Sequence, residues 1–151
     1  MCRLTLEHLS LSRQTVYVKD GKGKKDRIVP IGARALHWLV RYLNECRDQF
    51  MVDRQEDAVF LNDYGTAFRE NKLGDKVKRF MRNAGIDVPG SCHLLRHAMA
   101  THMLENGAEM RYIQAMLGHA NLSATQIYTH VSVRMLQKVH EETHPSNRCL
   151  K

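Results

Sequence analysis

The stretch His93-Leu94-Leu95-Arg96-His97 decides how this chain is interpreted, together with two short stretches that follow it: Leu117-Gly118-His119 and Ile127-Tyr128-Thr129-His130. His93 and Arg96 are three positions apart in a helix-like run, so both point to one face. Imidazoles, a guanidinium and a phenol are the groups with which a protein holds a phosphodiester and attacks it without a metal. We therefore treat these residues as a candidate phosphodiester site.

The bulk composition fits one globular domain. The chain has 151 residues, of which 43% are hydrophobic and 26% charged, and it shows neither a membrane-length apolar run nor a secretory leader. Its four cysteines are scattered without a CxxC pair, which predicts a cytoplasmic protein without a disulfide framework. The net charge of +7 attracts polyanions, with DNA the usual one, although a cationic surface that only aids solubility is equally compatible.

Periodicity predicts an α+β fold that is mainly helical, with a small antiparallel sheet near the N-terminus. A hairpin is expected from Thr15–Val18 and Ile28–Pro30 around a glycine-rich tip. Helical spacing predicts an amphipathic helix from residue 33 to about 48, and Val59–Leu61 is a short strand candidate.

The second half of the chain is predicted to be all helical. One helix carries Leu73, Val77, Phe80 and Met81 and ends at Gly85; others cover about 92–105, 109–117 and 132–142. The capping-box pattern of Ser123 and Gln126 predicts a helix start just before Tyr128, and the tail from Asn147 is expected to be loose.

Tyr128 is the candidate nucleophile and Arg96 the candidate phosphate clamp. A tyrosine hydroxyl has a pKa near 10, so attack on phosphorus requires a proton acceptor and nearby positive charge. A guanidinium binds two phosphate oxygens at once and stays charged throughout. The alternatives are a half-buried structural tyrosine and a solvated arginine, although Leu94, Leu95 and Ala98 surround Arg96 in the sequence.

The histidines and the hairpin complete the candidate site. His93 and His119 can donate hydrogen bonds to phosphate oxygens or carry a proton, unless they are core histidines satisfied by backbone. Gly118 is expected to let the chain turn before His119, whereas His97 and His102 are assigned to packing. The basic hairpin adds Lys22, a candidate proton donor, and Lys24, Lys25 and Arg27, candidate DNA phosphate contacts; spacing alone does not choose among the three lysines.

Taken together, these motifs resemble the tyrosine recombinase/integrase family, in particular its phage-integrase and Xer-like branch. The resemblance covers nearly the whole chain and includes the stretch from Val18 to Pro30. It implies DNA strand cleavage and rejoining through a 3′-phosphotyrosyl link, without metal or other cofactor. It also implies Tyr128 as nucleophile, His93 with Arg96 as the middle His-x-x-Arg pair, His119 as the late histidine and Lys22 as general acid.

One family feature has no match in these residues. The family has an earlier arginine, which precedes a stretch that Leu4–Leu9 resembles. Aligned on that stretch, the arginine would fall before Met1, so Arg3 lies too late in the sequence to be it. We therefore expect residues 1–145 to be a partial catalytic domain followed by a flexible tail (146–151), with the core-binding domain absent. Such a chain is expected to cleave DNA weakly or not at all.

The expected partner is double-stranded DNA in the nucleoid, with no membrane, and the resemblance to the family implies a homotetramer assembling on that DNA. The helix at 132–142 either docks on a neighbouring subunit or packs on its own domain. Two other classes remain: a non-catalytic DNA-binding remnant of a mobile element, and a zinc protein using the His93-x3-His97 spacing. The zinc hypothesis lacks both an HExxH glutamate and a cysteine pair.

Overall fold

The computed structural model describes residues 2, 4–19, 26–118 and 133–148. Its contacts divide the chain into two compact units. Unit 1 comprises residues 1–6 and 41–98, and unit 2 comprises residues 7–40 and 99–151.

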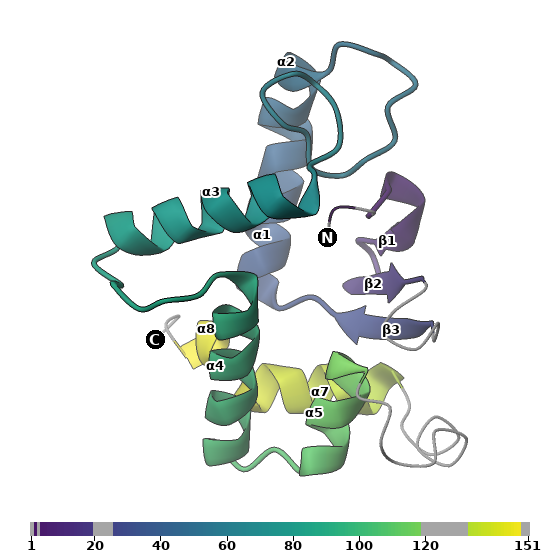
Figure 1. The fold of residues 1–151 in the computed structure, drawn as a ribbon. Helices are drawn as coiled ribbons and strands as arrows, with labels where there is room; N and C mark the ends of the chain where they lie inside the picture. Colours follow the sequence, from purple (N-terminus) through teal and green to yellow (C-terminus); the bar gives the residue numbers. More distant parts are fainter. Residues whose placement is uncertain (1, 3, 20–25, 119–132, 149–151) are drawn as a thin grey trace. The chain divides into compact units, whose positions relative to one another are not determined.

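Unit 2 contains a three-stranded antiparallel sheet in the order β1-β2-β3 (Figure 1). β2 (Thr15–Val18) and β3 (Arg27–Pro30) pair with Val16 opposite Val29, which confirms the predicted hairpin. β1 (Leu9–Ser10), preceded by the short helix η1 (Leu6–His8), was not predicted. Two residues are too few to show the alternation by which a strand is recognised in a sequence.

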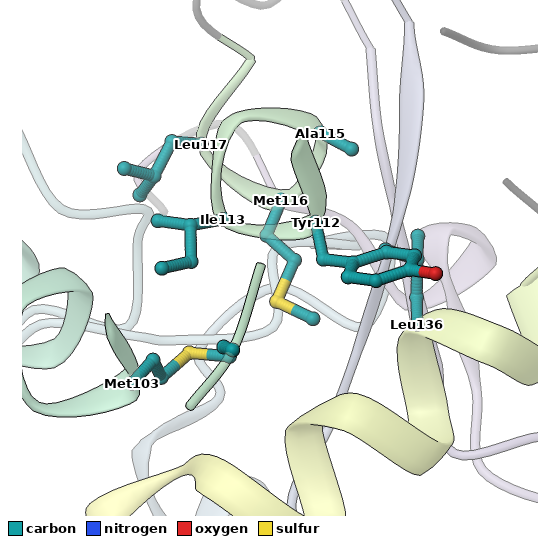
Figure 2. Close-up of a cluster of buried hydrophobic side chains, with 8 residues drawn as sticks. Met103, Tyr112, Ile113, Ala115, Met116, Leu117 and Leu136 are labelled. Atoms are coloured by element: carbon teal, nitrogen blue, oxygen red, sulfur yellow. The ribbon is translucent and has the colours of Figure 1, made fainter. Parts of the chain in front are cut away.

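Helices α5 (Met110–Leu117) and α7 (Val133–Thr143) pack against β3 and against each other. They build the core of unit 2 with the end of α4 (Cys92–Glu105), where Met103 is fully buried. Figure 2 shows the side chains of this cluster: Met103, Tyr112, Ile113, Ala115, Met116, Leu117 and Leu136. These three helices confirm the predicted ones, and the burial of Leu136 shows that α7 packs within its own unit.

The predicted helix from residue 33 is present as a continuous helical segment. It consists of α1 (Ala33–Arg41), a π-helical turn η2 (Tyr42–Cys46) and α2 (Arg47–Phe50). α3 (Glu70–Asn83) in unit 1 confirms the next predicted helix. The predicted stop is also confirmed, because Gly85 has a φ of +75°, a conformation that glycine adopts without a steric penalty.

The strand predicted at Val59–Leu61 is wrong. Only isolated bridges are present around it, joining Thr5 to Ala58 and Leu61 to Ala67. Val59 is fully buried, so the apolar run reflects packing in unit 1 and not membership of a sheet. The carbonyl of Ala58 accepts hydrogen bonds from the guanidinium of Arg47.

A short helix follows α7. Pro145–Arg148 form α8, and the flexibility expected of the tail (146–151) stays a prediction. Proline fits the first position of a helix, where its missing N–H has no helical partner to lose. Within the described parts of the chain, no helix is both long and apolar enough to cross a membrane.

Candidate functional site

The first two turns of α4 carry the His-x-x-Arg pair. Backbone N–H groups of Leu94 and Leu95 bind the carbonyl of Ser91, which fixes the start of this helix directly before the pair. His93 is exposed, whereas Arg96 is half-buried and has an interaction partner within the protein. The predicted helix and the three-residue spacing therefore place both side chains on one face of α4.

Gly118 ends α5 in the left-handed conformation. Its φ is +69°, and its N–H donates to the carbonyl of Gln114 at 2.8 Å. The predicted turn at this glycine is thus confirmed. The next candidate residues, His119 and Tyr128, lie outside the described residues.

Arg27 is connected to the interior of unit 2. Its Nε donates to the main-chain carbonyl of Met116 at 3.1 Å, and its side chain is half-buried. The hydrogen bond spans 89 positions of sequence, so no local pattern signals it. The hairpin lysines Lys22, Lys24 and Lys25 lie outside the described residues.

His97 and His102, which we assigned to packing, are both exposed. His102 instead pairs with Glu105 one turn further along α4, at 3.2 Å. Among the residues that the structure describes, the buried histidine is His140, which sequence reasoning missed and which stacks on His144 with ring centroids 4.3 Å apart.

Burial gives the two stacked imidazoles a preference for the neutral form. Burial, with a smaller contribution from His144, lowers the pKa of His140 to about 4. Burial also lowers the pKa of His144, whose Nδ1 accepts the N–H of Ser146 at 3.2 Å. Within the described ranges, no three His, Cys, Asp or Glu side chains gather where they could hold a metal ion.

The phage integrase family pattern matches residues 1–135 of this sequence. The chain belongs to the phage integrase family. Among its relatives, tyrosine recombinase XerC 2 of Ralstonia nicotianae is 53% identical over 143 residues, which cover 95% of this chain and 41% of that protein. The chain thus spans less than half the length of this relative.

Solved structures give the same phage integrase fold. XerA recombinase superposes with a TM-score of 0.72 at 33% identity, covering 92% of this chain and 50% of that one. XerH site-specific recombinase bound to its difH substrate superposes with a TM-score of 0.65 at 31% identity. The match covers 88% of this chain and 38% of that one. These likenesses confirm the mainly helical fold class with its small antiparallel sheet.

Proposed function

We propose that this protein acts in site-specific DNA recombination or integration, by cleaving and rejoining DNA strands through tyrosine. The observation that carries the proposal is the family match over residues 1–135, which includes every candidate site residue. XerH, a structural neighbour, is described as bound to a difH substrate. The net charge of +7 supports a polyanionic partner.

In the proposed reaction, the Tyr128 oxygen forms a bond to the scissile phosphorus and the bond to the 5′ oxygen breaks. Lys22 supplies the proton that the departing 5′ oxygen takes up. Arg96 binds the non-bridging oxygens, and His93 and His119 donate hydrogen bonds to them or accept the tyrosine proton. The 5′-hydroxyl of a second strand then attacks the phosphotyrosine, so one phosphodiester replaces another and no cofactor is consumed.

We propose further that residues 1–145 form a partial catalytic domain with low activity on its own. By the resemblance of Leu4–Leu9 to the family, the family's first arginine has no counterpart among these residues. Losing one preorganised donor from a developing oxyanion lowers the rate about 10²–10³-fold, and losing an arginine on a phosphoryl group lowers the rate about 10³–10⁵-fold.

The proposed setting is double-stranded DNA in the cytoplasm, with a homotetramer on two duplexes.

A nicked suicide duplex tests this function, because the cleaved strand diffuses away and traps the covalent adduct. The wild-type chain is expected to form a slow adduct that survives denaturing electrophoresis. Tyr128→Phe should form none at unchanged DNA affinity, whereas Tyr64→Phe, which alters an exposed tyrosine in unit 1, should react like wild type.

A sulfur in place of the 5′ bridging oxygen sharpens the test, because a thiolate leaves without a proton. Lys22→Ala should form little covalent adduct on the normal duplex and should form it readily on the sulfur-containing one. If the wild-type chain binds DNA but forms no adduct on either duplex, the result would instead favour the non-catalytic remnant.

A further inference from the structure

We infer that Arg27 is a positioning residue that holds the end of α5 at Gly118, and not one of the DNA phosphate contacts of the basic hairpin. The inference rests on the proposed function, because it concerns how the chain is aimed toward His119 and Tyr128. It is carried by contacts that all lie within unit 2.

The first contact is a cap on a helix end. Met116 is the second-last residue of α5, and its carbonyl accepts the Arg27 Nε hydrogen bond at 3.1 Å. The last four carbonyls of a helix have no partner in the helix itself. A cation at this end also interacts favourably with the helix dipole. Arg27 therefore satisfies an acceptor at the α5 terminus and adds a favourable charge there.

The second contact is the close approach of Arg27 to Gly118. A Cβ added at Gly118 would lie 2.8 Å from Nη1 and 3.0 Å from Cζ of Arg27. The φ of +69° favours glycine whatever the space around it, and a side chain at this position would also displace the Arg27 guanidinium. Arg27 therefore lies directly against the turn that ends α5.

The anchor of the guanidinium is itself held in place. Arg27 opens β3 and pairs with Val18 of β2, and β3 packs against α5 and α7. The preceding residue, Asp26, accepts a hydrogen bond from the hydroxyl of Tyr17, which ties the two strands together at the root of the hairpin. Arg27 therefore joins the hairpin that carries Lys22 to the helix that leads into His119.

NMR of the DNA-free protein tests the contact directly. The Arg27 Nε–H should exchange slowly with solvent, and Arg27→Gln should shift the amide signals of Leu117 and Gly118. Arg111→Gln is the matched control, because Arg111 also lies on α5 but pairs with Glu109 at its other end. Fast exchange in the wild type, or unchanged Gly118 signals in Arg27→Gln, would overturn the inference.

The salt dependence of DNA affinity separates positioning from phosphate contact. Each neutralised phosphate contributes about −0.9 to the slope of log affinity against log salt. Lys24→Gln, at the hairpin tip, is expected to make the slope shallower by about that amount, and Arg27→Gln to leave it unchanged. An equal loss of slope in Arg27→Gln would make Arg27 a phosphate contact and refute the inference.

Cleavage gives the third readout. Arg27→Lys keeps the charge but loses the planar fork, so it should lower the rate of adduct formation about tenfold or more at unchanged affinity. A wild-type rate in Arg27→Lys would contradict a positioning role. A wild-type protein without salt-dependent DNA affinity would refute the proposed function, and the Gly118 signals would still decide the role of Arg27.

Discussion

His140 shows how a single residue couples the stability of this fold to pH. Its side chain is 7% exposed on α7, and it stacks on His144, which follows the end of that helix. Burial disfavours the charged imidazolium, so the folded protein keeps this ring neutral at a pH where the unfolded chain protonates it.

The free energy of unfolding is therefore expected to fall in mild acid. The folded pKa of His140 is about 4, against an ordinary value of 6.5, so between these values the unfolded chain binds more protons. The contribution is fully present above pH 6.5 and is lost progressively as the pH falls toward 4, by up to about 3 kcal/mol. Urea unfolding at several pH values measures this loss.

His140→Gln removes the titrating ring and should flatten the pH profile. His102→Gln is the control, because this histidine is exposed and paired with Glu105. If both variants lose stability in acid as steeply as wild type, other groups cause the acid sensitivity.

Among the helices and loops, Arg47 connects α2 to the segment at 56–58. This arginine is 5% exposed, and its Nη2 donates to the carbonyls of Glu56 at 2.6 Å and Ala58 at 3.0 Å. Its Nε adds a further bond to Ala58 at 3.2 Å. The buried positive charge thus lies against main-chain carbonyl dipoles. These hydrogen bonds satisfy donors of the guanidinium and the two carbonyl acceptors of the loop, which belongs to no strand of the sheet.

Arg47→Met should keep most of the side-chain volume and leave two carbonyls without donors. Loss of these charge-assisted hydrogen bonds should lower the free energy of unfolding by about 3 kcal/mol. Arg41→Met is the matched control, because Arg41 makes an exposed ion pair with Glu45 and should cost less than about 1 kcal/mol. Similar stability of the two variants in urea would contradict the structural role of Arg47.

Arg47 also shows which elements sequence reasoning predicts and which it misses. Helices such as α3, α4 and α5 follow from periodicity within one segment, and the glycines predicted to end α3 and α5, Gly85 and Gly118, both have positive φ. The strand predicted at Val59–Leu61 is wrong because an apolar run reports burial, whereas pairing depends on a partner that local sequence does not specify. Ala58 forms only an isolated bridge with Thr5, and its carbonyl accepts hydrogen bonds from a guanidinium on another element.

At the scale of the whole molecule, the sequence predicts the family better than it predicts contacts. The motifs around His93, Gly118 and Tyr128 predict the family, and the family match over residues 1–135 confirms that prediction. They do not predict that Arg27 contacts the end of α5, since that contact joins residues 89 positions apart. The roles of Tyr128, His119 and the hairpin lysines stay predictions of the sequence.

At the same scale, the proposed assembly on DNA raises the question whether α7 packs only within unit 2 or also docks on a neighbouring subunit. Leu136 is 6% exposed in the core of unit 2, whereas its neighbour Met135 is 43% exposed. Leu136→Ala should therefore lower the free energy of unfolding by about 2–5 kcal/mol through a core cavity. Met135→Ala should change it by less than about 0.5 kcal/mol.

Light scattering with and without DNA, beside urea unfolding, separates a core role of α7 from a docking role. If Leu136 serves the fold, Leu136→Ala loses stability and, where it remains folded, assembles on DNA like wild type. If Leu136 instead seats on a neighbouring subunit, Leu136→Ala keeps its stability and fails to assemble. That second result would contradict the packing of α7 on its own unit, because one leucine side chain cannot be buried in both places at once.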